Sequence, residues 1–445
     1  MKRSSFFMHV FPCISTGRGI LGKVPWVAVL FFCSFCWART SERVEFPVNE
    51  STVVERQFFG ELDSGRLKSF SEADAFLVAS GITGSGAFAS YRYRFDAIRR
   101  QASAAVKGER DVAVRGRKLL TWLHAHVFKK YCSDASTVDR ILDRGEFNCL
   151  ASSVFYAVLA RDLRIPVTGL LVPDHALCVV MTASGPVDVE TGVRSGFNIS
   201  EEGKSELNKI TGFEYARFGS RRAVSVLQLI GEVYANRAVQ LASSSRNDTQ
   251  LLALYKKAFY FNPSSLFFAR NIAACLNNRI VDSFNSKNYA AAEEYIRQGR
   301  RFDPQDENFI SQQIYWYSVM ANNEVAAGRY QEGIDRTKKA LRTYPGAIRL
   351  HQSLAHLYVS WAHVFSTQEN YDAALNILTA GRNDIPNDTT ISYNLRTAFY
   401  NKAVQCYNTD NFKDAIIVCD QALLFFPGDA EIVRLRQSAG NGKKQ

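Results

Sequence analysis

Apolar residues recur at helical spacing throughout the second half of the chain. Stretches such as LFFARNIAACLNNRIVDSF and ISYNLRTAFYNKAVQCY repeat them every three or four positions, which gives a helix one apolar face. Prolines interrupt this pattern at a fixed interval of 41 residues, at Pro263, Pro304, Pro345, Pro386 and Pro427. Because proline ends a helix, the interval predicts one repeated unit of paired helices.

Three further positions follow the same period. The residues two after each proline are Ser265, Asp306, Ala347, Asp388 and Asp429, and four of them are good N-caps for a following helix. Small residues recur five before each proline, at Ala258, Gly299, Ala340, Gly381 and Ala422. Aromatic residues stand fifteen before four of the five prolines. We therefore predict helices that approach closely in a solenoid of five units, followed by a last helix near residues 429–438.

These units resemble the tetratricopeptide repeat (TPR), whose second helix has small residues and a terminal proline at the same relative positions. The segments NYAAAEEYIRQGRRFDP and NFKDAIIVCDQALLFFP have this pattern. The period exceeds the usual 34 residues by about two helical turns, so we expect longer first helices. The resemblance implies a scaffold that binds a protein or peptide partner. The alternative is a solenoid that only braces its neighbouring domain.

The middle of the chain has a different pattern. Apolar residues from Cys149 to Leu163 fall on one helical face, and Pro166 stops that helix. The segments 165–172, 176–182 and 187–191 are rich in β-forming residues and predict three short strands. This order predicts an α+β core in which a buried helix packs on an antiparallel sheet.

Candidate chemistry lies at the ends of these elements. Cys149 begins the buried helix, where the positive end of the helix dipole lowers the pKa of a thiol and can stabilise an oxyanion. His175 opens the second strand. Asp188 and Glu190 alternate along the third strand and share one sheet face, so either carboxylate could orient the imidazole. Cys149, His175 and one of the two acids form a candidate nucleophile triad.

This segment resembles the catalytic core of the transglutaminase-like superfamily, which has the papain-type order of Cys, His and Asp or Glu. The match consists of Cys149, Arg164-Ile165-Pro166, Pro173-Asp174-His175 and the strand from Asp188 to Thr191, within residues 118–200. The family often has aromatic residues after the nucleophile and shortly after the histidine. Here Leu150, Ala176 and Leu177 occupy those positions, which puts the choice of substrate in doubt.

The resemblance implies thiol-dependent acyl transfer, in which Cys149 attacks an amide carbonyl and His175 transfers the proton. Water as the acceptor gives a peptidase or amidase, whereas an amine gives cross-linking, and the sequence leaves this choice open. The Cys149 N–H is one expected oxyanion donor, and Asn148 is a second candidate. The alternative function is a non-catalytic envelope adaptor that keeps the fold and binds partners through its core and repeats.

The first 38 residues have the order of a secretory signal. Scattered basic residues precede the apolar run VPWVAVLFFCSFCWA, which ends at the small Ala38. A cleaved signal peptide or an uncleaved membrane anchor fits this order. Either predicts export to the periplasm or to the outer face of the cytoplasmic membrane of a bacterium. We interpret Cys33 and Cys36 within this run as incidental.

Composition excludes several other classes of protein. The chain has 445 residues, and 47% of them are hydrophobic, so it is neither disordered nor fibrous. The net charge of +11 includes four basic residues in the leader and falls to +7 without them, which argues against nucleic-acid binding. The most basic segment, residues 92–118, is interpreted as a solvated helix face.

No metal or cofactor site is indicated. His124 and His126 lie two apart on a predicted helix, so their side chains diverge. Gly81, Gly84 and Gly86 lack both a preceding strand and a phosphate-loop lysine. Cys178 lies three residues after His175 on one strand and is predicted to face the core.

Together these patterns predict five regions. They are a leader at 1–38, a helical segment at 39–117, the transglutaminase-like core at 118–222, the repeats with a capping helix at 223–438, and a tail at 439–445.

Overall fold

The structure, a computed structural model, describes residues 51–64, 67–214, 220–244 and 247–442. The predicted leader, with Cys33 and Cys36, lies outside the described residues. So do residues 39–50 and the last three residues of the predicted tail. None of the helices in the described residues is long and apolar enough to cross a bilayer.

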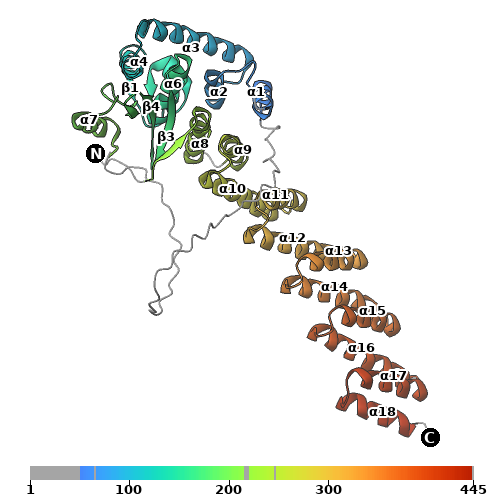
Figure 1. Cartoon of the computed structure of the whole chain (residues 1–445). Helices are drawn as coiled ribbons and strands as arrows, with labels where there is room; N and C mark the ends of the chain where they lie inside the picture. Colours follow the sequence, from blue (N-terminus) through green and yellow to red (C-terminus); the bar gives the residue numbers. More distant parts are fainter. Residues whose placement is uncertain (1–50, 65–66, 215–219, 245–246, 443–445) are drawn as a thin grey trace, which may run out of the picture. The chain divides into compact units, whose positions relative to one another are not determined.

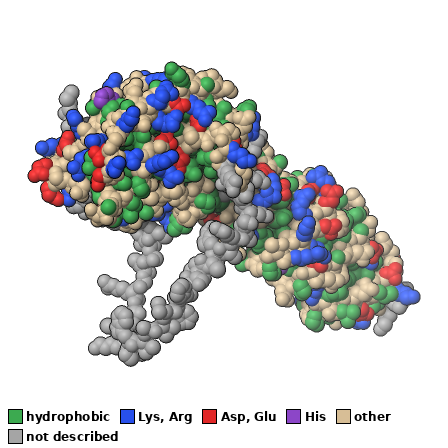
Figure 2. Space-filling view, turned by 45° about the horizontal axis from the view of Figure 1, so that its top comes forward, with side chains coloured by type: hydrophobic (Ala, Val, Ile, Leu, Met, Phe, Trp, Pro, Cys, Tyr) green, Lys and Arg blue, Asp and Glu red, His purple; other side chains and the backbone are tan. Residues whose placement is uncertain are grey.

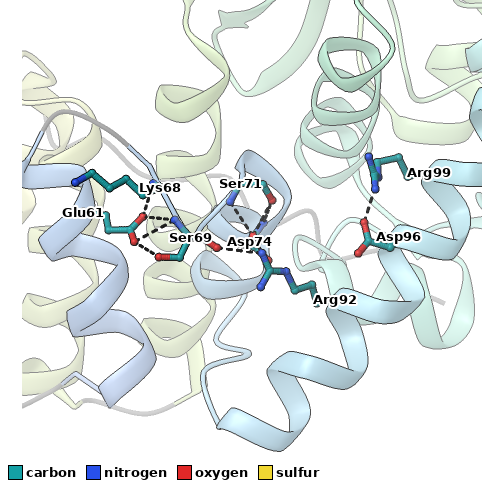
Figure 3. Close-up of polar contacts among 8 residues, drawn as sticks. All are labelled: Glu61, Lys68, Ser69, Ser71, Asp74, Arg92, Asp96 and Arg99. Atoms are coloured by element: carbon teal, nitrogen blue, oxygen red, sulfur yellow. Dashed lines mark hydrogen bonds and ion pairs between the residues drawn. The ribbon is translucent and has the colours of Figure 1, made fainter.

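Four helices open the described part: α1 (Val53–Asp63), α2 (Glu72–Ala79), α3 (Ser85–Ala105) and α4 (Val112–His126). The first three lie in the segment predicted to be helical, and the fourth begins there. Capping boxes begin the first two, with Thr52 and Glu55 at α1 and Ser71 and Asp74 at α2. The buried Asp74 carboxylate also accepts a hydrogen bond from Arg92 on α3 at 2.9 Å (Figure 3). The cap of one helix therefore also holds the next helix.

Four basic residues of the segment 92–118 form ion pairs with acidic residues of the chain itself. Arg92 binds Asp74, Arg94 binds Asp143 at 2.6 Å, and Lys118 binds Glu109 at 3.0 Å. Arg99 and Asp96 form a further pair within α3 (Figure 3). Figure 2 shows acidic side chains interspersed among the basic ones on the face in view.

A small α+β core follows. It contains a two-stranded parallel ribbon, three helices and a four-stranded antiparallel sheet in the order β5-β4-β3-β6. These elements are β1 (Lys130–Tyr131), α5 (Val138–Arg144), β2 (Glu146–Phe147), α6 (Cys149–Asp162), β3 (Val167–Val172), β4 (His175–Thr182), β5 (Gly185–Val189), α7 (Glu201–Thr211) and β6 (Arg222–Val224). The predicted helix at Cys149 and the three predicted strands are present, but the third strand ends at Val189, so Glu190 and Thr191 lie beyond it.

Helix α6 packs against β3 and β4 (Figure 1). On the α6 side, the strands contribute Cys178, Val180 and Val189, all fully buried in the main hydrophobic core. The side chains that alternate with these form a smaller cluster, in which Leu170, Val172 and Leu177 pack with Phe213. The alternation therefore buries both faces of the sheet.

Helix pairs make up the rest of the chain (Figure 1). They are α8 (Val226–Ser244) with α9 (Asp248–Phe261), α10 (Leu266–Asn285) with α11 (Tyr289–Phe302), α12 (Glu307–Ala326) with α13 (Tyr330–Thr343), α14 (Ile348–Thr367) with α15 (Tyr371–Asp384), and α16 (Thr389–Asn408) with α17 (Phe412–Phe425), followed by α18 (Ala430–Gly442). Every second helix has 14 residues, and the first helices from α10 to α16 have 20. The predicted long first helices are confirmed.

The periodic residues have the predicted structural roles. Ser265, Asp306, Asp388 and Asp429 each accept a hydrogen bond from a backbone N–H in the first turn of the next helix. The small residues lie where helices meet. A Cβ at Gly299 would stand 2.5 Å from the Phe309 ring, and one at Gly381 would stand 2.9 Å from the Tyr358 ring.

The main hydrophobic core runs from α1, with Phe58, through the sheet and into the repeats as far as Trp316 on α12. Two smaller cores continue along the repeats, one around Leu354 and one around Leu395. The first repeats thus share the core of the α+β region, whereas the later repeats have cores of their own.

Candidate functional site

Cys149 is the first residue of α6, a helix whose remaining residues are nearly all buried. The preceding residue, Asn148, caps the helix by accepting the Ala151 N–H at 2.9 Å. The Cys149 thiol therefore lies at the positive end of a helix dipole and remains partly accessible. This is the environment in which a thiolate is stabilised.

His175 begins β4, directly after the two-residue turn Pro173-Asp174 that joins it to β3. Asp174 has a φ of 60°, a conformation that aspartate tolerates better than most residues. The His175 side chain is only 2% exposed, and its Nε2 lies 2.7 Å from Oε2 of Glu190, whose side chain is completely buried. Nε2 donates to this carboxylate, which leaves Nδ1 as the nitrogen available to Cys149.

Strand register decides between the two predicted acids. Asp188 pairs with Val179, four residues along β4 from His175, a distance of about 13 Å. Its carboxylate instead binds Arg221 at 2.7 Å. Glu190 follows the last residue of β5 and is therefore nearer to the start of β4. The structure brings Glu190, and not Asp188, to His175.

The chain after β5 fixes the Glu190 carboxylate. Its Oε1 accepts the Gly192 N–H at 3.2 Å, and its backbone N–H donates to Gly196 O at 2.8 Å. A side chain at Gly196 would clash with the carbonyl of Glu190, so glycine is needed for this close approach. Thr191, the next residue, shares its hydroxyl with Ser152 and Ser153 of α6. The acid is therefore held against the helix that carries Cys149.

The electrostatics of the site stabilise a thiolate and an imidazolium together. Burial alone would raise the pKa of Cys149, but the hydrogen bond and charge of His175, together with the Ala176 N–H, hold it below its ordinary value. Burial alone would lower the pKa of His175. The Glu190 carboxylate and the hydrogen bonds to Cys149 and Glu190 outweigh burial and raise this pKa to about 10.

Tyr131 is a site residue that the sequence did not reveal. Tyr131 pairs with Phe147 across the β1–β2 ribbon and packs edge-on against its ring. Phe147 stands two residues before Cys149. The Tyr131 hydroxyl donates to the Cys149 sulfur and accepts the Cys149 N–H. Burial and the adjacent thiolate raise the pKa of Tyr131, so it keeps its proton. A lone tyrosine 18 positions before the cysteine has no motif that could have identified it.

Asn148, the second predicted oxyanion donor, is committed elsewhere. Its side-chain oxygen caps α6, and its amide nitrogen donates to Ser133 O at 3.1 Å. The residue is buried. The hydroxyl that reaches the Cys149 sulfur and N–H belongs to Tyr131.

Phe213 is the second site residue missed by the sequence. It follows α7 and stacks on the His175 ring, with 4.0 Å between ring centroids and 14° between planes. Gly212, with a φ of 75°, turns the chain at the end of α7. Phe213 lies 38 positions after His175, so only the fold brings the two rings together.

The other predicted groups are structural. Cys178 is fully buried, as predicted, and donates to Ser153 O at 3.3 Å. His124 contacts Thr191 O through Nε2 at 3.0 Å, while His126 contacts Trp122 O, so the two rings do diverge. In the described ranges, no three His, Cys, Asp or Glu side chains cluster as metal ligands.

Comparisons with known proteins found likeness only among solved structures. No protein-family model matches the chain, and no curated protein matches it. The TPR domain of P58(IPK) aligns at 14% identity over 49% of this chain and 60% of that one, with a TM-score of 0.18. YrrB, described as a TPR protein with an unusual peptide-binding site, aligns at 16% identity over 46% of this chain and 91% of its own, with a TM-score of 0.16.

Human IFIT1, in a dimer with m7Gppp-AAAA, aligns at 13% identity over 88% of this chain and 70% of its own, with a TM-score of 0.16. TM-scores this low do not support any assignment, so the assignment of the repeats rests on the helices themselves. The 41-residue period, the 14-residue second helices and the small residues at their contacts show that residues 226–442 form a TPR-like helical-repeat array.

Proposed function

We propose that this protein is a cysteine-dependent acyl-transfer enzyme of the transglutaminase-like type, exported to the bacterial envelope, whose repeats bind a protein partner. The observation that carries the proposal is the buried His175–Glu190 pair beside Cys149 at the start of α6. A buried carboxylate that orients an imidazole next to a thiol is the arrangement of a nucleophile triad.

In the proposed reaction the Cys149 thiolate attacks an amide carbonyl, and the carbon–oxygen π electrons move to the oxygen. In this proposal the Tyr131 hydroxyl, which hydrogen-bonds the Cys149 sulfur, donates to that oxyanion, and the Cys149 N–H that it accepts in the free enzyme is the second donor once the hydroxyl turns to the substrate. The tetrahedral intermediate collapses, the carbon–nitrogen bond breaks, and the His175 imidazolium protonates the departing amine. A thioester on Cys149 remains. His175, now neutral, accepts a proton from the incoming water or amine as that acceptor attacks the thioester. The carbon–sulfur bond then breaks, which releases the acyl product and returns Cys149 to the thiolate beside the His175 imidazolium.

The assignment of a partner to the repeats rests on their surface. Phe267 on α10, Tyr315 on α12 and Tyr393 on α16 are exposed on the first helices. Exposed aromatic side chains are enriched at protein interfaces. Export rests on the apolar run of residues 24–38, which has the length and flanks of a secretory signal.

The test is the pH dependence of alkylation of the full-length chain by iodoacetamide, with each cysteine followed separately by mass spectrometry. Cys406 is a matched internal control because it is also partly accessible and burial raises its pKa. We expect Cys149 to react at pH values where Cys406 does not, and we expect His175→Ala to remove this difference. Equal alkylation profiles for Cys149 and Cys406 would refute the proposal of an enzyme and would favour the alternative of a non-catalytic adaptor.

A further inference from the structure

The aromatic contact on the imidazole is the least expected feature of the candidate site. The His175 side chain is almost inaccessible, although it lies at the first position of a strand, next to a turn. The face-to-face stack with Phe213 covers one side of its ring. Because a π face attracts a cation, this geometry favours the charged form of the imidazole over the neutral form.

Phe213 is held in place by the end of α7. Its N–H donates to Thr211 Oγ1 at 3.1 Å, and its carbonyl accepts from Asn208 Nδ2 at 3.2 Å. Helix α7 is itself anchored by Leu207, which is fully buried, and Ser195 binds Glu206 at 2.8 Å. The 192–197 loop that fixes Glu190 therefore also anchors the helix that positions Phe213.

The groups that act on His175 come from several elements. Glu190, which follows β5, and Cys149, on α6, both hydrogen-bond the His175 ring. Tyr131 of β1 hydrogen-bonds Cys149 rather than the ring itself. From α4, His124 binds the carbonyl of Thr191, the neighbour of Glu190. Asp188 is tied to Arg221. Phe213 adds an uncharged aromatic face to this set.

We propose that Phe213 is a positioning residue of the site, which fixes the His175 ring by stacking and stabilises its protonated form against solvent. This proposal deepens the proposed function and rests on it for its meaning in catalysis. The contact itself is a property of the fold and can be measured without any substrate. With Phe213 in place, the imidazolium persists beside the Cys149 thiolate over a wider range of pH.

The test is a pH titration of ¹³C-labelled histidine in the full-length chain by NMR, with the His175 signal identified by its loss in His175→Ala. In the wild type we expect a ring-current shift of this signal from Phe213. In Phe213→Leu we expect the titration midpoint to fall by about one pH unit. Phe213→Trp should restore it, whereas Ile210→Ala, on the exposed part of α7, should have no effect.

The possible results separate this inference from the proposed function. A midpoint that is the same in wild type and Phe213→Leu would overturn the role of Phe213, even if Cys149 alkylates as an activated thiol. A midpoint that falls in Phe213→Leu while Cys149 reacts like Cys406 would refute the enzyme and uphold the contact. If Phe213→Leu does not fold, the wild-type spectrum still decides, because the absence of a ring-current shift rules out the stack.

Discussion

Single residues decide the chemistry of the candidate site, and Glu190 is the most informative of them. Its carboxylate is the main charge that raises the pKa of His175 to about 10. Removing the charge while keeping the shape, as in Glu190→Gln, should lower this pKa toward the ordinary value of about 6.5. The pH range in which His175 is charged should then end at a lower pH. The ¹³C-histidine titration measures the shift directly.

Asp188→Asn is the matched control for Glu190→Gln. It removes a carboxylate two residues earlier in the chain, on β5, but that carboxylate binds Arg221 and lies about 13 Å along the sheet from His175. We expect the wild-type midpoint for His175 in Asp188→Asn. If Asp188→Asn lowered the midpoint as much as Glu190→Gln, the assignment of Glu190 as the partner would be wrong.

The candidate site was only partly predictable at this scale. The sequence identified Cys149, His175 and a pair of acids because each lies at the end of a recognisable helix or strand. It could not choose between Asp188 and Glu190, because that choice depends on strand register, which is set by packing. Tyr131 and Phe213 reach the site from β1 and from the end of α7, and neither belongs to a local pattern.

At the scale of elements, the turns between the paired helices repeat as regularly as the helices do. Lys287, Gly328, Glu369 and Asp410 stand 41 residues apart, and each has a φ between 56° and 70°. Only one of the four turns has glycine, the residue that adopts this left-handed conformation without a steric cost. The other three turns therefore carry a small strain.

Replacing Glu369 with glycine should relieve this strain. The left-handed conformation costs an ordinary residue about 1–2 kcal/mol, and the added freedom of glycine in the unfolded chain offsets part of the gain. We expect Glu369→Gly to raise the free energy of unfolding by about 0.5–1 kcal/mol. Urea unfolding followed by circular dichroism would measure the change.

The neighbouring residue provides the control for this substitution. Gln368 has a φ of −96°, is also exposed, and ends the same helix. Gln368→Gly relieves no strain and should be neutral or slightly destabilising. A gain of equal size in both variants would mean that the turn conformation is not the cause.

The periodic sequence also explains why the repeats were predicted better than the rest of the fold. The proline, the N-cap and the small residue recur at one interval, so a unit that departs from the pattern, such as the one with Ala347 at the cap, can still be predicted from the other four. The four N-terminal helices have no such repetition, and only a helical segment could be predicted there. The helix that follows Asp111 continues to His126, beyond the predicted boundary at residue 117, because its buried face, with Leu119, Leu120 and Leu123, belongs to the α+β core.

At the scale of the whole molecule, the first repeats share their hydrophobic core with the candidate site. Lys257 on α9 forms a buried ion pair with Glu55 on α1 at 2.9 Å, and Arg237 on α8 donates to the carbonyl of Ala79 at 2.7 Å. The main core is continuous from α1 to α12. The later repeats contact only their neighbours along the array, and such repeats can unfold locally.

Two large-to-small substitutions within the repeats should therefore destabilise different parts of the chain. Phe268 on α10 and Leu395 on α16 are both completely buried, but Phe268 belongs to the main core and Leu395 to the core around α14–α18. Each truncation to alanine should cost about 2–5 kcal/mol. Native-state hydrogen exchange, resolved by mass spectrometry, should show lost protection in α14–α18 for Leu395→Ala, and in α6 and the sheet for Phe268→Ala.

Alkylation of Cys149 adds a readout at the site itself. Because local opening of the last repeats leaves the main core closed, Leu395→Ala should keep the wild-type alkylation profile of Cys149. Phe268→Ala opens the core that contains α6, so it should make buried Cys178 reactive as well. If Leu395→Ala instead lowered protection in α6 to the same extent as in α16, the chain would unfold as one cooperative unit, and the separate cores would have no thermodynamic meaning.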